Sequence, residues 1–116
     1  MSFPAIDDLH LKRPTIIDIN LDALCRNFLK IAQHVGRANV MPILKANAYG
    51  CGLIPCAKAL QNAGAKSFGV ALLQEAVDLR RAGISIPILV LGGLLGGQID
   101  HYLHYDLDMT ASSVFK

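Results

Sequence analysis

Charged residues are scarce in this sequence, and they gather in no run of one sign. Only 17% of the 116 residues are Asp, Glu, Lys or Arg, against about 25% in a typical soluble domain, and the formal net charge is +2. Binding to nucleic acid or to an acidic membrane surface requires a cluster of basic side chains. The composition therefore predicts no nucleic-acid partner and no membrane partner.

A long apolar segment is also missing. The amino terminus, MSFPAIDDLHLKRP, has no apolar stretch long enough for a secretory signal. The longest uncharged window, residues 82–99, contains Pro87 and five glycines, which favours a buried strand and turn over a membrane helix of about 20 apolar residues. The three cysteines form no compact disulfide pattern, so we predict reduced thiols and a cytoplasmic location.

Apolar residues are abundant, at 53% of the chain, and their spacing predicts the secondary structure. TIIDI (15–19) is rich in β-forming residues, and Asn20 is a good cap for a helix whose apolar face runs from Leu21 to Val35, with Gly36 as its stop. Further strands are predicted at 40–44, 67–71, 86–91 and 107–111, and further helices at about 54–63, 73–83 and 98–104.

The alternation of strands and helices predicts an α/β fold. The strands lack polar alternation, which is typical of a parallel sheet covered by helices, either doubly wound or a (β/α)8 barrel. Four such units make about half of a barrel, which typically takes around 250 residues. The chain ends at TASSVFK, where Ser112 or Ser113 could cap a helix that has barely begun. We therefore expect a truncated barrel, whose exposed edges would make it oligomeric or poorly soluble alone.

Lys45, directly after the predicted strand 40–44, is the main candidate for chemistry. In α/β folds the ligand lies at the carboxyl ends of the strands. A lysine in a pocket there is partly desolvated, which lowers its pKa and makes the neutral amine available as a nucleophile or base. Alternatively, the side chain pairs with a carboxylate or extends into water.

Other candidate features are weaker. LGGLLGG (91–97) lacks the GxGxxG spacing and a following Gly-Lys-Ser/Thr, so we interpret it as a turn. His101 and His104 lie three apart on a predicted helix without a third ligand in view, so no metal site is predicted. Arg80 and Arg81 are expected to be surface charges.

The residues from Lys45 onward resemble a known motif. KANAYGCG (45–52) matches seven of eight positions of KANAYGHG, the pyridoxal-phosphate (PLP) lysine motif of the alanine racemases. RPTIIDINLDALCRN (13–27) resembles the opening of that family. GAKSFGVALLQEAVDLRRAGI (64–84) and PILVLGG (87–93) resemble its second and third barrel units. The resemblance extends over roughly residues 13–111.

This resemblance implies a PLP-dependent isomerase that interconverts L- and D-alanine, the latter a building block of peptidoglycan. The family has an amino-terminal (β/α)8 barrel and a carboxyl-terminal β domain, and it forms homodimers. Residues 1–116 would be the amino-terminal part of the barrel, without the carboxyl-terminal domain. Lys45 matches the lysine that forms a Schiff base with PLP and serves as one of two acid/bases. Tyr49 matches a tyrosine beside the cofactor, and Leu91 a residue that lines its pocket.

The sequence departs from the family in two respects. Cys51 stands where histidine is usual, and no tyrosine of this chain matches the second acid/base, which the partner subunit's carboxyl-terminal domain supplies. The arginine facing the pyridine nitrogen and the main phosphate-binding residues would lie beyond Lys116. The chain alone is therefore expected to be inactive. Two alternatives remain open: a related barrel PLP enzyme (a broad-specificity racemase or an amino-acid decarboxylase), and a non-catalytic fragment.

Overall fold

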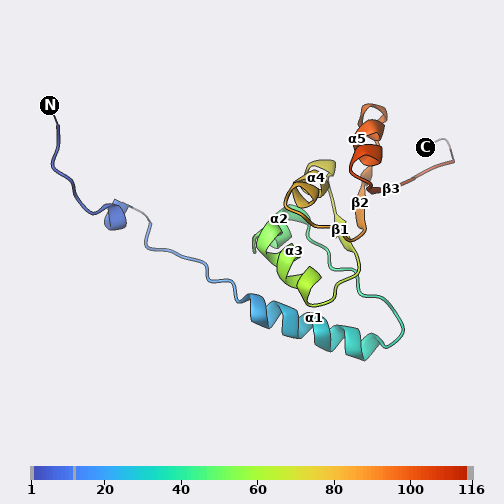
Figure 1. Cartoon of the computed structure of the whole chain (residues 1–116), viewed down its shortest axis with the longest axis horizontal. Helices are drawn as coiled ribbons and strands as arrows, with labels where there is room; N and C mark the ends of the chain where they lie inside the picture. The colour runs from blue at the N-terminus through green and yellow to red at the C-terminus, as the bar shows by residue number, and fades with distance from the viewer. Residues whose placement is uncertain (1, 12, 115–116) are drawn as a thin grey trace.

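Three parallel strands form the centre of the molecule. The computed structural model describes residues 2–11 and 13–114. Its strands are β1 (Phe68–Val70), β2 (Ile88–Gly93) and β3 (Asp108–Thr110), in the order β1-β2-β3 (Figure 1). The predicted strand 40–44 contributes one parallel bridge, between Ile43 and Gly69 on β1. Of this segment, only that bridge is regular sheet structure.

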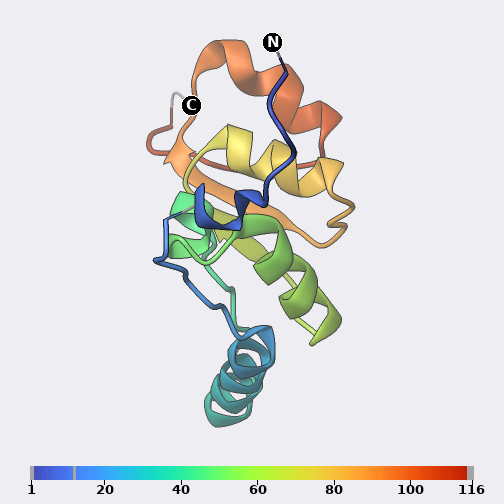
Figure 2. The same ribbon diagram turned by 90° about the vertical axis from the view of Figure 1, so that its left-hand side faces the viewer.

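Helices connect the strands, which is why the strands can run parallel. α3 (Leu53–Asn62) precedes β1, and α4 (Leu73–Arg81) joins β1 to β2. The short η2 (Gly96–Gln98) and α5 (Ile99–His104) join β2 to β3. Figure 2 shows α3 and α4 side by side against the sheet. The α/β class predicted from the sequence is confirmed.

The core lies between the sheet and these helices. Alternate residues of β2 are buried on the side that faces α4, while Leu89 and Leu91 on the other side are partly exposed. On α4, the 3.6-residue spacing of the sequence predicts that Ala76, Val77 and Leu79 face inward, and all three are buried. The most deeply buried members of the core are Cys56, Ala57, Phe68, Val70, Ala76, Leu79, Ile88 and Val90.

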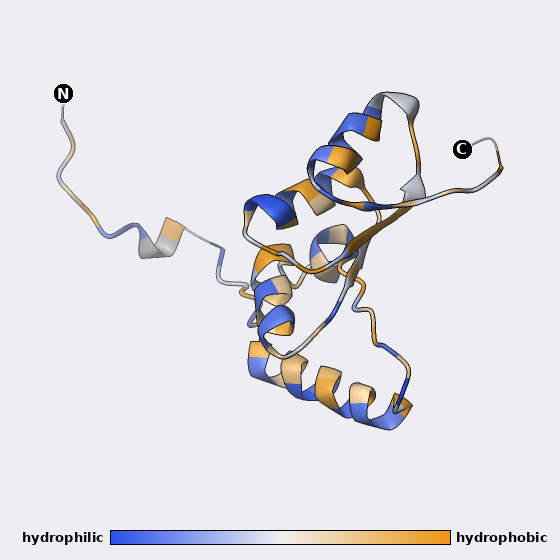
Figure 3. Ribbon diagram, turned by 45° about the vertical axis from the view of Figure 1, so that its right-hand side comes forward, coloured by the Kyte–Doolittle hydropathy of each residue, from blue (hydrophilic) through white to orange (hydrophobic). Residues whose placement is uncertain are grey.

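The first helix, α1 (Leu21–Val35), packs on α3 at one end of the molecule. The side chain of Asn20 accepts a hydrogen bond of 2.9 Å from the Ala23 N–H, so the predicted cap is confirmed. Only Phe28 of its apolar face is buried, whereas Ile31 remains 52% exposed. In Figure 3 this face is the hydrophobic stripe along the helix. The expected inward face is therefore only partly covered.

The segment before α1 does not form the strand that its β-rich composition favours. Residues 15–19 form no strand, and the side chains of Ile16 and Ile17 are 76% and 80% exposed. A strand is stable only when another strand pairs with its backbone, and no described residue pairs with this segment. The segment instead continues the extended amino-terminal arm, which contains the 3-10 turn η1 (Asp8–Leu11) (Figure 1).

At the other end, Ser112 and Ser113 cap no helix within the described residues. The chain from residue 111 to 114 is irregular, and Phe115 and Lys116, where such a helix would continue, lie outside the described part. None of the helices in that part is both long enough and apolar enough to span a membrane.

Arg80 is not the free surface charge that the sequence suggested. Its guanidinium donates to the carbonyl oxygens of four residues, at distances between 2.7 and 2.9 Å. These acceptors are Ile84, Ile86, Tyr105 and Asp106. The planar fork of five donors thereby joins α4 to the loop before β2 and to the loop before β3. The prediction for Arg80 was wrong because its acceptors are backbone atoms, which carry no sequence signal.

Replacing Arg80 by alanine is expected to lower the free energy of unfolding by about 2 kcal/mol. Hydrogen bonds from a charged donor contribute about 1.5–3 kcal/mol each, but this side chain is partly solvated and its contribution is reduced. Urea unfolding followed by circular dichroism would measure the change. Arg81→Ala is the matched control, because Arg81 makes an exposed bond of 3.2 Å to the Tyr105 hydroxyl and a cation–π contact with its ring at 5.9 Å, but no side-chain bond to a main-chain carbonyl of any described residue. Equal losses in both variants would contradict this role of Arg80.

Candidate functional site

Lys45 lies where the chain leaves the sheet. The Leu44 N–H donates to the Gly69 carbonyl at 2.8 Å, and the Gly69 N–H donates to the Pro42 carbonyl at 3.0 Å. These two bonds align the segment in parallel with β1, so Lys45 follows at the carboxyl edge of the sheet. The carboxyl ends of β1 and β2 lie at the same edge, because all these segments are parallel. This is the edge at which α/β folds bind ligands.

A left-handed turn carries the motif. In α2 (Lys45–Tyr49), φ is 52° at Ala46, 56° at Asn47, 54° at Ala48 and 55° at Tyr49. Four consecutive non-glycine residues in this region are unusual, since each costs about 1–2 kcal/mol relative to a right-handed turn. The next residue, Gly50, has φ of 87° and carries no such cost.

Internal hydrogen bonds hold this turn closed. The Ala48 N–H donates to the Leu44 carbonyl at 2.9 Å, and the Gly50 N–H donates to the Ala46 carbonyl at 3.1 Å. The side chains of Leu44 and Ala48 are only 3% and 6% exposed, so the turn is also fixed by packing. Lys45 and Tyr49, by contrast, are exposed.

Lys45 is therefore less buried than we expected from its position. Desolvation requires walls around the amine, and the described residues leave this side chain exposed. Tyr49 belongs to the same turn and is 64% exposed. The structure brings these two candidates together through the turn.

Leu91 lies on the open face of the sheet. A side chain added at Gly69 would have its Cβ 3.7 Å from Leu91 Cδ1, 3.4 Å from the Met41 sulfur and 2.6 Å from Ile43 Cδ1. Leu91 therefore lies with Ile43 and Met41 on one face, above Gly69. Leu91 is 43% exposed and belongs to β2, the strand next to β1, so it forms an apolar wall on this face of the sheet.

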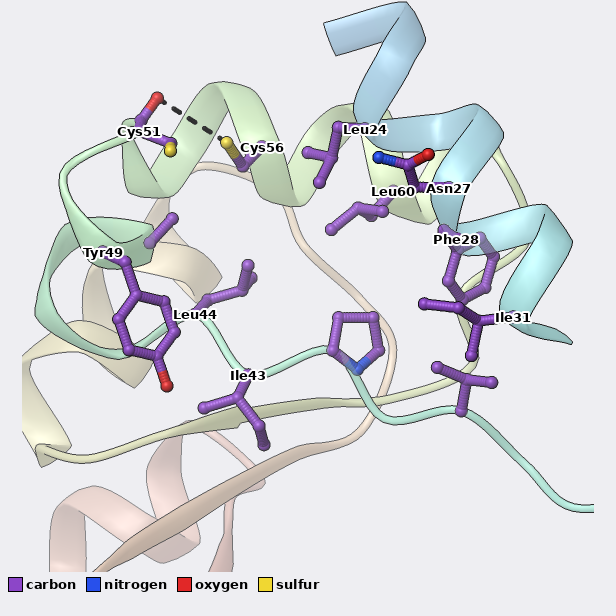
Figure 4. Close-up of a pocket in the computed structure, with 13 residues that line it drawn as sticks. Leu24, Asn27, Phe28, Ile31, Ile43, Leu44, Tyr49, Cys51, Cys56 and Leu60 are labelled. Carbon is purple, nitrogen blue, oxygen red and sulfur yellow. Dashed lines mark hydrogen bonds between the residues drawn. The ribbon is translucent and has the colours of Figure 1, made fainter. Parts of the chain in front are cut away.

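An apolar cavity of about 360 Å³ lies between α1, segment 40–44 and α3, and Ile43 and Tyr49 contribute to its lining. In the close-up of Figure 4, Tyr49 and Cys51 lie at one end and Phe28 and Ile31 at the other. None of the described residues that line it is charged, and Lys45 is not among them. An anionic phosphate would find no cation there, so this cavity does not fit the cofactor that the motif implies.

Cys51 and Cys56 adjoin this cavity. Cys51 is exposed, whereas Cys56 is buried and its thiol donates to the Cys51 carbonyl at 3.6 Å. Burial raises the pKa of the Cys56 thiol, and the neighbouring Cys51 and Cys25 raise it further. The two thiols therefore differ in access, and burial favours the protonated form of Cys56.

Sequence reasoning found Lys45 and Tyr49 but missed Asn47. The Asn47 Oδ1 accepts a hydrogen bond of 2.9 Å from the Leu53 N–H at the start of α3. The available signal was an asparagine followed three residues later by glycine, since these two residue types adopt positive φ most readily.

The parallel β–α units, with an apolar open face and a lysine at the carboxyl edge, define an α/β chain that forms part of a (β/α)8 barrel. Residues 19–116 match the family described as alanine racemase, N-terminal domain. The chain belongs to the alanine racemase family.

Individual relatives agree with this assignment. The chain is 42% identical to the alanine racemase of Carboxydothermus hydrogenoformans over 98 residues, which are 84% of this chain and 27% of that protein. It is 40% identical to alanine racemase 1 of Bacillus subtilis over 103 residues, 88% of this chain and 26% of that protein. The chain thus spans about a quarter of the length of these relatives.

Solved structures agree as well. The chain resembles the alanine racemase from E. faecalis with a TM-score of 0.79 and 36% identity, over 82% of this chain and 26% of that one. It also resembles the alanine racemase from Bartonella henselae, whose structure has covalently bound pyridoxal phosphate. The TM-score of this match is 0.74 and the identity is 30%, over 78% of this chain and 27% of that one.

Iodoacetamide is expected to modify Cys51 well before Cys56 near neutral pH. The thiolate is the reactive form, and the raised pKa keeps the Cys56 thiol protonated while burial shields it. Because the folded state holds this proton to higher pH than the unfolded state does, the free energy of unfolding should fall as pH rises above the ordinary thiol pKa. Peptide mass spectrometry of the alkylated protein would measure the two rates. Equal rates in the folded chain, with no increase at Cys56 in urea, would contradict this assignment.

Proposed function

We propose that residues 1–116 form the amino-terminal part of the PLP-binding barrel of an alanine racemase, with Lys45 as the covalent attachment point of the cofactor. The observation that carries this proposal is the position of Lys45, which begins a left-handed turn at the carboxyl edge of a parallel sheet. Its family membership and the covalently bound pyridoxal phosphate of the Bartonella henselae relative support the proposal.

The residues at this edge fit the cofactor chemically. An exposed primary amine can condense with an aldehyde, which a buried, ion-paired lysine could not do as readily. Leu91 and Ile43 offer an apolar wall on the open face of the sheet, and Tyr49 offers an aromatic ring with a hydroxyl in the same turn as the lysine. PLP, when bound, supplies a ring that accepts electron density as the α-proton of the amino acid leaves.

The residues of this chain would then have separate tasks. The amine of Lys45, once released by the substrate, would take the α-proton from D-alanine and return one in the opposite direction. Tyr49 would lie beside the cofactor and restrict its movement. Leu91 would exclude water from one side of the ring, which strengthens electrostatic interactions at the reacting atoms.

Racemisation needs a second acid/base on the opposite face of the substrate. We infer that this group, the main phosphate contacts and the carboxyl-terminal β domain belong to sequence that these 116 residues do not include, in a homodimeric cytoplasmic enzyme that supplies D-alanine for peptidoglycan. The 116-residue chain alone would bind at most the cofactor.

Borohydride reduction of the chain with PLP is expected to place a pyridoxyl group mainly on Lys45. Lys30, Lys58 and Lys66 are exposed as well, so access alone would label all four side chains alike. A formed site should favour Lys45 on the order of tenfold, because orientation raises the effective concentration of the amine. Digestion and mass spectrometry would measure the distribution of the adduct.

Two variants control this experiment. Lys45→Ala should abolish the dominant adduct, while Lys66→Ala should leave it unchanged. An even distribution over all exposed lysines would mean that the chain has no cofactor site of its own and would favour a non-catalytic fragment.

The chain alone is expected to show no conversion of L-alanine to D-alanine, because one of the two acid/bases is missing. Co-expression with the remaining part of a related alanine racemase should restore activity, and Lys45→Ala should remove it again. Chiral chromatography of the alanine pool would measure both results. Full activity of the isolated chain would contradict the need for a second group.

A further inference from the structure

We propose that Asn47 is a positioning residue for Lys45: its side-chain amide ties the left-handed turn to the start of α3 and so sets the direction of the lysine. This inference rests on the proposed role of Lys45, and it concerns a residue that does not itself touch the reacting atoms. It is carried by the contacts of Asn47, by the conformation of the turn and by the surroundings of Lys45.

Asn47 is bonded to the end of the turn and to two residues beyond it, Gly52 and Leu53. Its Oδ1 accepts from the Leu53 N–H at 2.9 Å. Its main-chain carbonyl accepts from the Gly50 N–H at 3.1 Å and from the Gly52 N–H at 3.0 Å. Both oxygens of one residue therefore connect the turn to the chain that enters α3.

The bond to Leu53 takes the place of a helix cap. The first N–H groups of a helix lack partners within the helix, and a Ser, Thr, Asp or Asn at the preceding position usually supplies an oxygen. That position of α3 is Gly52, which has no side chain. Asn47, five positions upstream, supplies the oxygen instead, so stabilisation of α3 and closure of the turn depend on the same side chain.

The conformation of the turn makes such a tie necessary. Ala46, Ala48 and Tyr49 adopt positive φ against their own preference. Asparagine tolerates this region better than other non-glycine residues, so position 47 suits it on two grounds. Without the side-chain bond to Leu53, the turn would keep its backbone bonds, including that from the Gly52 N–H to the Asn47 carbonyl, and the burial of Leu44 and Ala48, but it would lose its side-chain tie to α3.

The backbone alone directs Lys45. Within the described part of the chain, its side chain makes no hydrogen bond or ion pair. On one side it is held by the Leu44 bond to Gly69, and on the other by the turn that Asn47 closes. A change in the turn would therefore redirect the amine without removing any contact of the lysine itself.

Three variants separate the two properties of Asn47. Asn47→Gly keeps access to positive φ but removes the acceptor oxygen. Asn47→Asp keeps the acceptor and places a negative charge near the amino terminus of α3, which is favourable there. Asn47→Gln keeps the amide but shifts its oxygen by one methylene. Asn62→Ala is the matched control, because Asn62 is exposed at the end of α3 and bonds to none of these residues.

The readout is the ratio of pyridoxyl adduct on Lys45 to that on Lys58 and Lys66 after treatment with PLP and borohydride. We expect this ratio to fall about tenfold, to an even distribution, in Asn47→Gly and Asn47→Gln, because a misplacement of about 1 Å is enough to remove the advantage of orientation. It should be retained in Asn47→Asp and Asn62→Ala. Hydrogen exchange at the Leu53 amide should accelerate only where the ratio falls, and circular dichroism would verify that each variant is folded.

The outcomes are distinguishable. If the wild-type chain labels Lys45 selectively and Asn47→Gly does so equally, Asn47 does not position the lysine and only this inference is overturned. Equal losses in Asn47→Asp and Asn47→Gly would overturn it as well, since rescue by the retained acceptor would be absent. If the wild-type chain labels all lysines evenly, both the proposed cofactor site and this inference are wrong.

Discussion

Two backbone hydrogen bonds to Gly69 hold the candidate site in place. Segment 40–44 is joined to the sheet by a single bridge, yet it alone positions Lys45 at the carboxyl edge. The absence of a side chain at Gly69 is part of this arrangement, because a Cβ there would lie 2.6 Å from Ile43 Cδ1 on the open face. The lysine and the turn that follows depend on this close parallel pairing, which also places Ile43 on the same face as Leu91.

The turn after Lys45 shows a conflict between local preference and tertiary structure. Ala46, Ala48 and Tyr49 have no intrinsic reason to adopt positive φ, and their conformation persists only because other contacts determine it. Backbone outliers of this kind gather at functional sites, where they direct a side chain that regular structure would place elsewhere. Here the outlier directly follows the lysine proposed to bind the cofactor, and its main external tie is one asparagine.

The exposed apolar surfaces have a common cause. Each β–α unit has an apolar helix stripe and an apolar sheet face, which become buried only against neighbouring units. In these 116 residues, Ile31 on α1, Ile17 in the arm and Leu91 on the open face all remain exposed. The alanine racemases that this chain resembles are about four times as long, since it spans about a quarter of their length. These surfaces are the ones that neighbouring β–α units cover in a complete barrel.

Features that depend on neighbours along the chain follow from the amino-acid sequence alone. Helix faces, the Asn20 cap and the lysine motif could be predicted because the 3.6-residue period, capping and turn chemistry act over a few residues. The tertiary structure decided what depends on distant backbone atoms. Arg80 meets carbonyls 25 and 26 residues away, and residues 15–19 stay unpaired despite their β-rich composition. Composition records the preference of a segment, but hydrogen bonding between strands requires a partner that only the folded chain can bring to it.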